Sequence, residues 1–340
     1  MDTNNPTLSI SITCRMMPMP NEHATKPRSF SRRQTLHLGL GWATGLALGG
    51  AFQISVAQAP VASPTRGATY DRPEMLIDAD RLAGFRSDPA TILVGFMPEQ
   101  DFAKDHIPGS VQLDWPVLEV TDASDETIAR WREQISLTLG SLGITGDRPV
   151  AAYDAGTLFA ARLWWILHYL GHEDNHVVNG GLAAWQQTAH ETTTGAIPAA
   201  VAASPAAKSF QVTPRTDVLA QLDEVRARLD DPGVAIVDAR TPEEYTAGHI
   251  PGAVNINYPR NAVAETPLFW KPADELRAMY EEAGITPDKR VIPYCSTGVR
   301  SAVTFFTLRL IGYQDVGLYT GSWQEWGNRP DTPRTEGDQP

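Results

Sequence analysis

An internal repeat limits the folds open to this chain more than any other feature. The segment DHIPGSVQLDW, residues 105–115, returns as GHIPGAVNINY, residues 248–258. Each copy then has a landmark position followed by two glycines and a tryptophan at intervals of 17, 26 and 31 residues: Asp154 with Gly171, Gly180 and Trp185, and Cys295 with Gly312, Gly321 and Trp326. Self-similarity in a fixed register indicates two copies of one domain.

The fold class follows from the pattern within each copy. A chain of 340 residues, 42% of them hydrophobic, is long enough for two domains. In the second copy, VAIVDA and VIPYC are short apolar runs typical of buried strands, TPEEYTAG has a Thr cap with Pro and Glu behind it, and VRSAVTFFTLRLIG has helical length and a Gly stop. We therefore expect an α/β fold of two tandem domains, each a mainly parallel sheet covered by helices on both faces.

Composition shifts divide the chain into five expected parts. The stretch TTTGAIPAAVAASPAAKSF is rich in Ala, Pro and Thr and has no periodicity, which is typical of a linker. The expected parts are a leader (1–59), an N-terminal domain (68–190), a linker (191–210), a C-terminal domain (211–330) and a tail (331–340).

The first 59 residues have the pattern of an export signal. SRRQTL carries the paired Arg32 and Arg33, and a charge-free apolar stretch follows and ends in Ala57-Gln58-Ala59. This predicts a twin-arginine leader cleaved after Ala59, with the twin-arginine export machinery as a partner and a periplasmic or otherwise exported product. The alternative is an uncleaved membrane anchor, because the apolar stretch is about as long as a bilayer requires.

Charge and cysteine content exclude two classes of protein. Without residues 1–59 the chain keeps 23 basic and 38 acidic residues, a formal charge of −15, which disfavours nucleic acid as a partner. The only cysteines are Cys14, inside the expected leader, and Cys295. A disulfide framework is therefore excluded.

The position of Cys295, between an expected strand and an expected helix, is typical of a nucleophile. If VIPYC is a strand and a helix starts near Val299, the intervening Ser, Thr and Gly must form a tight loop at a helix N-terminus. Backbone N–H groups of such a loop converge into an anion-binding concavity that favours a thiolate. Arg300 adds a cation nearby. A buried core cysteine is the alternative, but the small polar loop favours a nucleophile.

These motifs together resemble a known family. The two HIPG segments, VDAR, the Cys-x-x-Gly-x-Arg loop and GSWQEW are similar to those of tandem-domain rhodaneses, sulfurtransferases with an inactive N-terminal copy, and the resemblance covers residues 75–328. It implies a persulfide on Cys295, an anionic sulfur donor, a thiol or cyanide acceptor, and no metal or cofactor. The site residues that it implies are Cys295, the loop Ser296, Thr297, Gly298, Val299 and Arg300, a substrate-side Arg240, and a supporting Asp238 that orients a basic group or forms a structural salt bridge.

The first copy lacks the residues that correspond to Cys295, Asp238 and Arg240. By the shared register, Asp154 stands in place of Cys295, Gly95 in place of Asp238, and Met97 in place of Arg240. A carboxylate cannot form a persulfide. We therefore expect the N-terminal domain to be structural or to contribute to a substrate cleft between domains.

The sulfur donor and the reaction class are less tightly specified. Neutral Ser296 and Thr297 beside Arg300 favour thiosulfate, which is compact and doubly charged, whereas 3-mercaptopyruvate needs a second arginine, for which Arg240 is the candidate. Cysteine phosphatases have five residues between Cys and Arg, and this chain has four, which favours sulfur over phosphate. A non-enzymatic persulfide carrier remains open.

Other signals are assigned to structure. His168, His172 and His176 have a metal-like spacing, but Gly171 interrupts them, which indicates a helix end. Tryptophans are expected in the core, namely Trp164, Trp165, Trp323 and Trp326. The histidines of the two HIPG segments, His106 and His249, are expected to stabilise their turns, because the inactive copy has one too.

Overall fold

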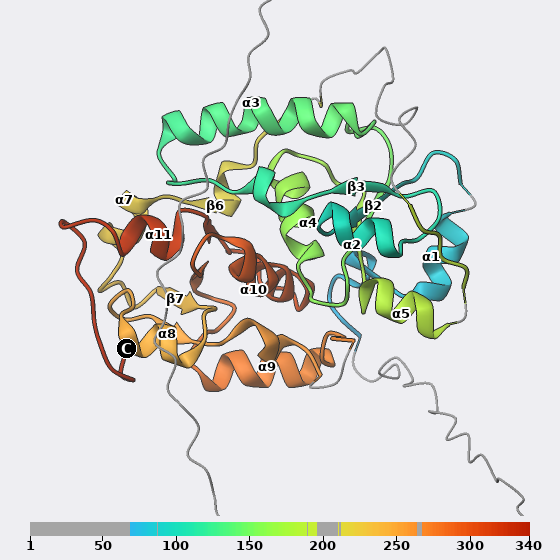
Figure 1. The fold of residues 1–340 in the computed structure, drawn as a ribbon. Helices are drawn as coiled ribbons and strands as arrows, with labels where there is room; N and C mark the ends of the chain where they lie inside the picture. Colours follow the sequence, from blue (N-terminus) through green and yellow to red (C-terminus); the bar gives the residue numbers. More distant parts are fainter. Residues whose placement is uncertain (1–68, 87, 189, 196–209, 211, 264–266) are drawn as a thin grey trace, which may run out of the picture. The chain divides into compact units, whose positions relative to one another are not determined.

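Parallel sheets organise both halves of the chain in this computed structural model (Figure 1). It describes residues 69–340 without 87, 189, 196–209, 211 and 264–266. The expected leader, including Arg32, Arg33 and Cys14, and most of the expected linker lie outside the described residues. Within them, no helix combines the length and apolarity that crossing a membrane requires.

The N-terminal domain has a five-stranded sheet in the order β1-β5-β4-β2-β3, with every pair parallel. Its strands are β1 (Leu76–Ile77), β2 (Ile92–Phe96), β3 (Val111–Leu113), β4 (Val150–Tyr153) and β5 (Asn175–Val178). Its helices are α1 (Ala79–Phe85), α2 (Glu99–Lys104), α3 (Asp125–Ser141), α4 (Ala160–Tyr169) and α5 (Gly181–Gln187), with short 3₁₀ turns η1 (Pro73–Met75) and η2 (Trp115–Leu118).

The C-terminal domain repeats this order in two pieces. Strands β8-β7-β9 form one parallel sheet and β10-β6 a second, and a parallel bridge from Val291 to Val316 links them. The strands are β6 (Leu219–Ala220), β7 (Val234–Asp238), β8 (Val254–Asn255), β9 (Arg290–Tyr294) and β10 (Leu318–Tyr319). The helices are α7 (Leu222–Ala227), α8 (Pro242–Ala247), α9 (Ala273–Glu282), α10 (Val299–Leu310) and α11 (Ser322–Trp326), with turns η3 (Thr216–Val218) and η4 (Tyr258–Asn261).

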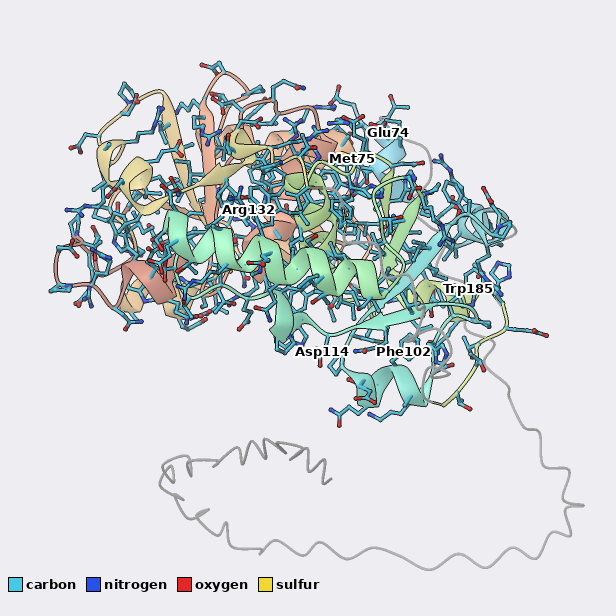
Figure 2. All side chains as sticks on the ribbon, turned by 90° about the horizontal axis from the view of Figure 1, so that it is seen from above. Glu74, Met75, Phe102, Asp114, Arg132 and Trp185 are labelled. Carbon is cyan, nitrogen blue, oxygen red and sulfur yellow. The ribbon has the colours of Figure 1, made fainter. Side chains whose placement is uncertain are left out.

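Both faces of each sheet are covered, as expected. Successive strand residues point to opposite faces; accordingly Val94 packs in the largest core cluster, while Leu93 packs with Phe102 of α2 and Trp185 of α5. Figure 2 labels Phe102 and Trp185 in this domain, together with Arg132 on the long α3. The predicted α/β class with two tandem domains is confirmed.

Helices α4 and α10 join the two domains through a shared core. Trp164 and Trp165 of α4 face Phe305 and Phe306 of α10, and the rings of Trp164 and Phe306 meet edge to face at 5.1 Å. All four side chains are buried. Because the largest cluster takes residues from both halves, neither half can open here without exposing apolar surface of the other.

The histidines are held by separate backbone partners. In both HIPG segments Nδ1 lies close to a carbonyl oxygen four residues earlier, at 2.8 Å for His106 and 2.9 Å for His249, which confirms their role in the turn. In the other set, His168 stacks on Trp164, while His172 and His176 bind carbonyl oxygens of Arg148 and Glu74. No group of three His, Cys, Asp or Glu side chains among the described residues could hold a metal ion.

The shared core predicts that the two domains unfold together. Phe305→Ala should lower the free energy of unfolding by about 3–5 kcal/mol, because a fully buried ring is replaced by a cavity. Calorimetry should show one transition at a lower temperature. Leu137→Ala is the control, since Leu137 on α3 is 61% exposed and its loss should cost under about 0.5 kcal/mol. Two separate transitions, with only one shifted in Phe305→Ala, would contradict the shared core.

Candidate active site

Cys295 lies between the end of β9 and the start of α10, with its side chain 1% exposed. The backbone N–H of Gly298 donates to its Sγ at 3.2 Å, and the Ser301 hydroxyl approaches the same sulfur at 3.6 Å. Both donors belong to the loop or to the first turn of a 12-residue helix, whose N-terminus favours negative charge. Sγ therefore lies next to two hydrogen-bond donors at a helix N-terminus.

Residues 295–298, named the catalytic loop for the role expected of Cys295, are oriented by α11. The N–H groups of Trp323 and Gln324 donate to the carbonyl oxygens of Cys295 and Ser296, at 2.9 and 3.0 Å. In a trans peptide the C=O and N–H point in opposite directions. The N–H groups of Ser296 and Thr297 consequently point away from α11. The amide of Cys295 itself donates to the Ser322 hydroxyl at 3.2 Å.

Gly298 has a conformation that a side chain would disturb. Its φ is +88°, in the left-handed region, and it caps α10. A Cβ atom there would lie 2.9 Å from the Thr320 hydroxyl and 3.2 Å from Nη1 of Arg162. The glycine that the sequence motif singled out is thus required both by backbone geometry and by the closeness of its neighbours.

The equivalent loop of the N-terminal domain shows what such a loop can hold. The Asp154 carboxylate accepts N–H bonds from Gly156 and Thr157 on Oδ1, at 2.7 and 2.8 Å, and from Ala160 on Oδ2 at 2.7 Å. It is 4% exposed; burial raises its pKa, and these N–H bonds oppose that shift. In the N-terminal domain the loop amides therefore bind a carboxylate of the protein, that of Asp154, in the place where a bound anion would lie.

The C-terminal domain has amides at the same register positions. By the shared register, the donors to Asp154 correspond to the N–H groups of Thr297, Gly298 and Ser301. One of these, Gly298, donates to Cys295 Sγ. The two backbones differ in detail, since α4 begins at Ala160 and α10 begins two register positions earlier at Val299.

Arg300 closes the loop by binding a partner that the sequence analysis did not name. Its guanidinium donates to both oxygens of Glu244, at 2.6 and 2.8 Å, and to the Ser296 hydroxyl at 2.6 Å. The bond to Arg300 lowers the pKa of Glu244 to about 2. Glu244 first, and then the Cys295 sulfur, raise the pKa of Arg300. The cation thus lies near the sulfur but is largely neutralised by α8.

Asp238 and Arg240 form a buried ion pair. Nε and Nη2 of Arg240 donate to the carboxylate at 2.6–3.0 Å, and Nη2 also donates to the carbonyl oxygen of Gly248 at 2.7 Å. The guanidinium lies 4.5 Å from the ring of Trp323, and Arg240 is 2% exposed. These are the contacts of a structural salt bridge that supports the HIPG turn, so we do not retain Arg240 as a substrate ligand.

The first copy replaces this ion pair with apolar packing. A Cβ at Gly95 would lie 2.7 Å from the ring of Phe102 and 2.9 Å from the Tyr153 hydroxyl, so the ring occupies the space that a side chain would need. Met97 is 3% exposed and packs in the same cluster. Apolar groups can substitute for a buried ion pair at little cost.

The N-terminal domain reaches the catalytic loop at two points. Thr297 donates to Glu119 at 3.2 Å, and Arg162 of α4 lies against Gly298 and Thr320. Arg162 had a visible sequence signal, as the one charged residue of the apolar run FAARLWWIL. Glu244 had a weaker signal, because TPEEY indicates only a helix cap.

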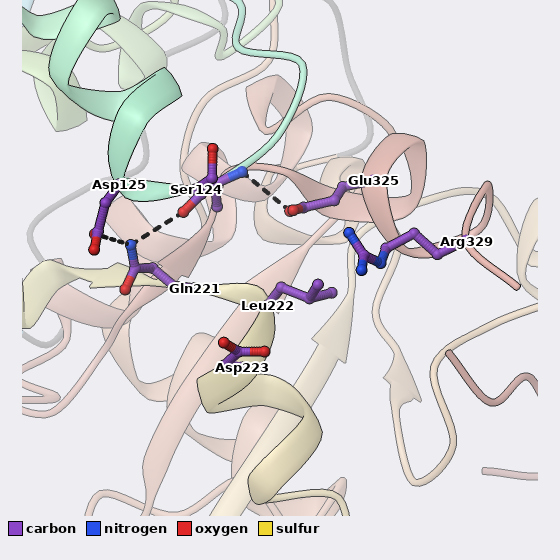
Figure 3. A pocket seen from close by; sticks show the side chains of 8 residues that line it. Ser124, Asp125, Gln221, Leu222, Asp223, Glu325 and Arg329 are labelled. Atoms are coloured by element: carbon purple, nitrogen blue, oxygen red, sulfur yellow. Dashed lines mark hydrogen bonds between the residues drawn. The ribbon is translucent and has the colours of Figure 1, made fainter. Parts of the chain in front are cut away.

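Behind the loop, the domains also meet across α11. Oε2 of Glu325 accepts a hydrogen bond from the N–H group of Ala123 at 3.1 Å and another from the hydroxyl of Tyr319 at 2.8 Å. Gln221 donates to the carbonyl oxygen of Ala123 at 3.1 Å, and Ala123, Gln221 and Glu325 line a pocket of about 300 Å³ (Figure 3). The contacts fix α11, which in turn orients the catalytic loop.

The Glu244–Arg300 pair predicts a pH-dependent contribution to stability. Glu244→Gln should lower the free energy of unfolding at pH 7 by about 1 kcal/mol, because Glu244 is partly exposed and solvent screens the pair. Since folding lowers the carboxyl pKa from 4.5 to about 2, the difference from wild type should be full above about pH 4.5 and fade as the pH falls toward 2. Urea unfolding at pH 7 and pH 3 measures it. Glu243→Gln, on the same helical turn, is the control; equal effects of the two variants at pH 7 would contradict the assignment.

Comparison with known proteins agrees with this geometry. The rhodanese-like domain family matches residues 78–188 and 221–329. A thiosulfate sulfurtransferase of Azotobacter vinelandii is 34% identical over 76% of this chain and 96% of its own length. The 3-mercaptopyruvate sulfurtransferase of Escherichia coli is 32% identical over 77% of this chain and 92% of its own.

A solved structure shares the fold. The anaerobic ergothioneine biosynthesis enzyme from Chlorobium limicola superposes with a TM-score of 0.67 at 24% identity, over 78% of this chain and 71% of that chain. The two family matches cover most of the chain and coincide with the two repeats found in the sequence. The chain belongs to the rhodanese family and carries two tandem rhodanese-like domains.

Proposed function

We propose that this protein is a thiosulfate sulfurtransferase that carries sulfur as a persulfide on Cys295. The observation that carries the proposal is the pair of equivalent loops: one holds a carboxylate with three backbone amides, and the other presents a thiol to a register-equivalent amide. Relatives named as thiosulfate sulfurtransferases support the reaction class.

The proposed first step is displacement at sulfur. The Cys295 thiolate attacks the outer sulfur of thiosulfate, the sulfur–sulfur bond of the donor breaks, and its electron pair leaves with sulfite. The product is a Cys295 persulfide with one negative charge on the terminal sulfur. The loop amides and the hydroxyl of Ser301 are the donors placed to stabilise that charge.

The second step regenerates the thiolate. A nucleophilic acceptor attacks the terminal sulfur, and the bond to the Cys295 sulfur breaks with its electron pair remaining on that sulfur. Cyanide as acceptor leaves as thiocyanate, and a thiolate acceptor leaves as a persulfide. Neither step requires a cofactor to balance atoms or electrons.

Thiosulfate is preferred over 3-mercaptopyruvate as donor because the second arginine that a carboxylate donor needs is engaged. Nε and Nη2 of Arg240 donate to the Asp238 carboxylate and to the Gly248 carbonyl oxygen. The alternative donor is kept because one relative is named as a 3-mercaptopyruvate sulfurtransferase. A phosphatase is less favoured, because Glu244 occupies both arms of the arginine that would have to bind phosphate.

Persulfide formation can be read directly by mass. After incubation with thiosulfate and removal of the donor, the intact wild-type protein should gain one sulfur atom, and the gain should map to the Cys295 peptide. Cys295→Ser should gain none and lose sulfur transfer. The matched control is Asp154→Ala at the equivalent position, which should gain sulfur as wild type does, even if it is less stable. Near-normal turnover in Cys295→Ser would contradict the assignment of Cys295 as the nucleophile.

Donor preference is tested by comparing kcat/KM for thiosulfate and for 3-mercaptopyruvate. We expect the larger value for thiosulfate, and we expect Arg240→Ala to keep that ratio while losing stability, because it leaves the Asp238 carboxylate buried without a partner. The ratio is informative even if the variant is partly unfolded, since both donors see the same active fraction. An excess for 3-mercaptopyruvate that disappears in Arg240→Ala would reverse the choice of donor.

A further inference from the structure

Arg162 of the N-terminal domain is a fully buried cation in an apolar helix. It is 0% exposed, and its guanidinium lies 4.8 Å from the ring of Trp165. The other residues of α4 in the same turn are apolar and belong to the shared core. An arginine in such a place is costly unless its hydrogen bonds and charge are used.

The hydrogen bonds of Arg162 lead to the catalytic loop of the other domain. Nη2 donates to the Leu118 carbonyl and to the Thr320 hydroxyl, both at 3.1 Å, and Nη1 reaches the Gly298 carbonyl at 3.5 Å. Nε is buried and has no acceptor in the structure. Gly298 is the residue whose N–H contacts Cys295 Sγ. Arg162 and the nucleophile are thus linked through one residue.

The charges around Cys295 leave Arg162 a distinct role. Arg300 of α10 is paired with Glu244 of α8, and Glu119, from the segment after η2, binds Thr297. Arg162 donates to two carbonyl oxygens and one hydroxyl, and no carboxylate of the described residues forms an ion pair with it. Burial lowers its pKa to about 10, while the charges of Cys295 and Glu119 oppose this shift, so it stays protonated at neutral pH.

We propose that Arg162 is a positioning residue for the catalytic loop, and that its charge favours the anionic forms of Cys295 from across the domain interface. It holds the Gly298 and Thr320 segments together and supplies positive charge that Glu244 does not cancel. The inactive domain thereby contributes to the reaction of the active one. This inference rests on the proposed role of Cys295 as the nucleophile.

The test measures the thiol without any sulfur donor. In a Cys14→Ser background, only Cys295 can react with iodoacetamide, and the rate is followed against pH. Arg162→Gln, which removes the charge but keeps hydrogen-bonding groups, should raise the pH midpoint of alkylation by about one unit. Arg162→Lys, which keeps the charge, should stay within about 0.3 of wild type. Arg309→Gln is the control, because Arg309 binds carbonyls at the far end of α10.

Each outcome decides the proposal. A folded Arg162→Gln protein with the wild-type midpoint would overturn it, as would a shift of the same size in Arg309→Gln. If Arg162→Gln does not fold, the lysine variant decides: its kcat/KM should fall several-fold with the midpoint kept, because an ammonium cannot span three acceptors, and a midpoint raised by a full unit would contradict the inference. Failure of Cys295 as the persulfide carrier would appear separately, as loss of the sulfur mass gain with the alkylation difference intact.

Discussion

The packing of α4 against α10 is the contact on which the rest of the structure depends. It merges the apolar surfaces of the two domains into one core, with Trp164 and Trp165 facing Phe305 and Phe306. It also sets the position of the catalytic loop, because α10 begins at that loop and α4 carries Arg162 onto it. The stability of the interface and the geometry of the nucleophile are therefore consequences of the same packing.

The two copies of the domain have the same arrangement of strand, loop and helix but place different side chains at the loop. Both place a loop between a buried strand and a buried helix, and both place a side chain under its amides. In the first copy the side chain is Asp154, which accepts three N–H bonds from the loop and the start of α4. In the second it is Cys295, whose thiol accepts from the N–H group of Gly298. One difference in sequence, Asp154 against Cys295, therefore decides which group the loop amides face.

Much of this was predictable from the sequence, and the exceptions share a cause. Period, strand composition and the repeat register predicted the parallel sheets of the two domains and the position of Cys295, because these depend on neighbours in the chain. Glu244 was recognised only as part of a helix cap; it does form the capping box with Thr241, yet the same carboxylate also binds Arg300, 56 residues away.

The contacts of Arg162 and Arg240 could not be predicted from the sequence, for related reasons. The contact between Arg162 and Gly298 spans 136 residues and exists only because two helices pack, so no local pattern contains it. For Arg240, the position in the chain suggested a substrate contact, but the direction of its side chain is fixed by Asp238 and the Gly248 carbonyl. Neighbours in sequence indicate which groups can meet, and packing decides which of them do.

We expect the loop of Cys295 to hold a persulfide. The amides that bind it should be those that correspond, in the other copy, to the amides that bind the Asp154 carboxylate. The most direct measurement is a crystal structure of the protein after reaction with thiosulfate. It should show a second sulfur on Cys295 within hydrogen-bonding distance of the N–H groups of Thr297, Gly298 or Ser301, with Asp154 and its three amides unchanged. A terminal sulfur turned away from these amides, or located on no part of Cys295, would contradict the account.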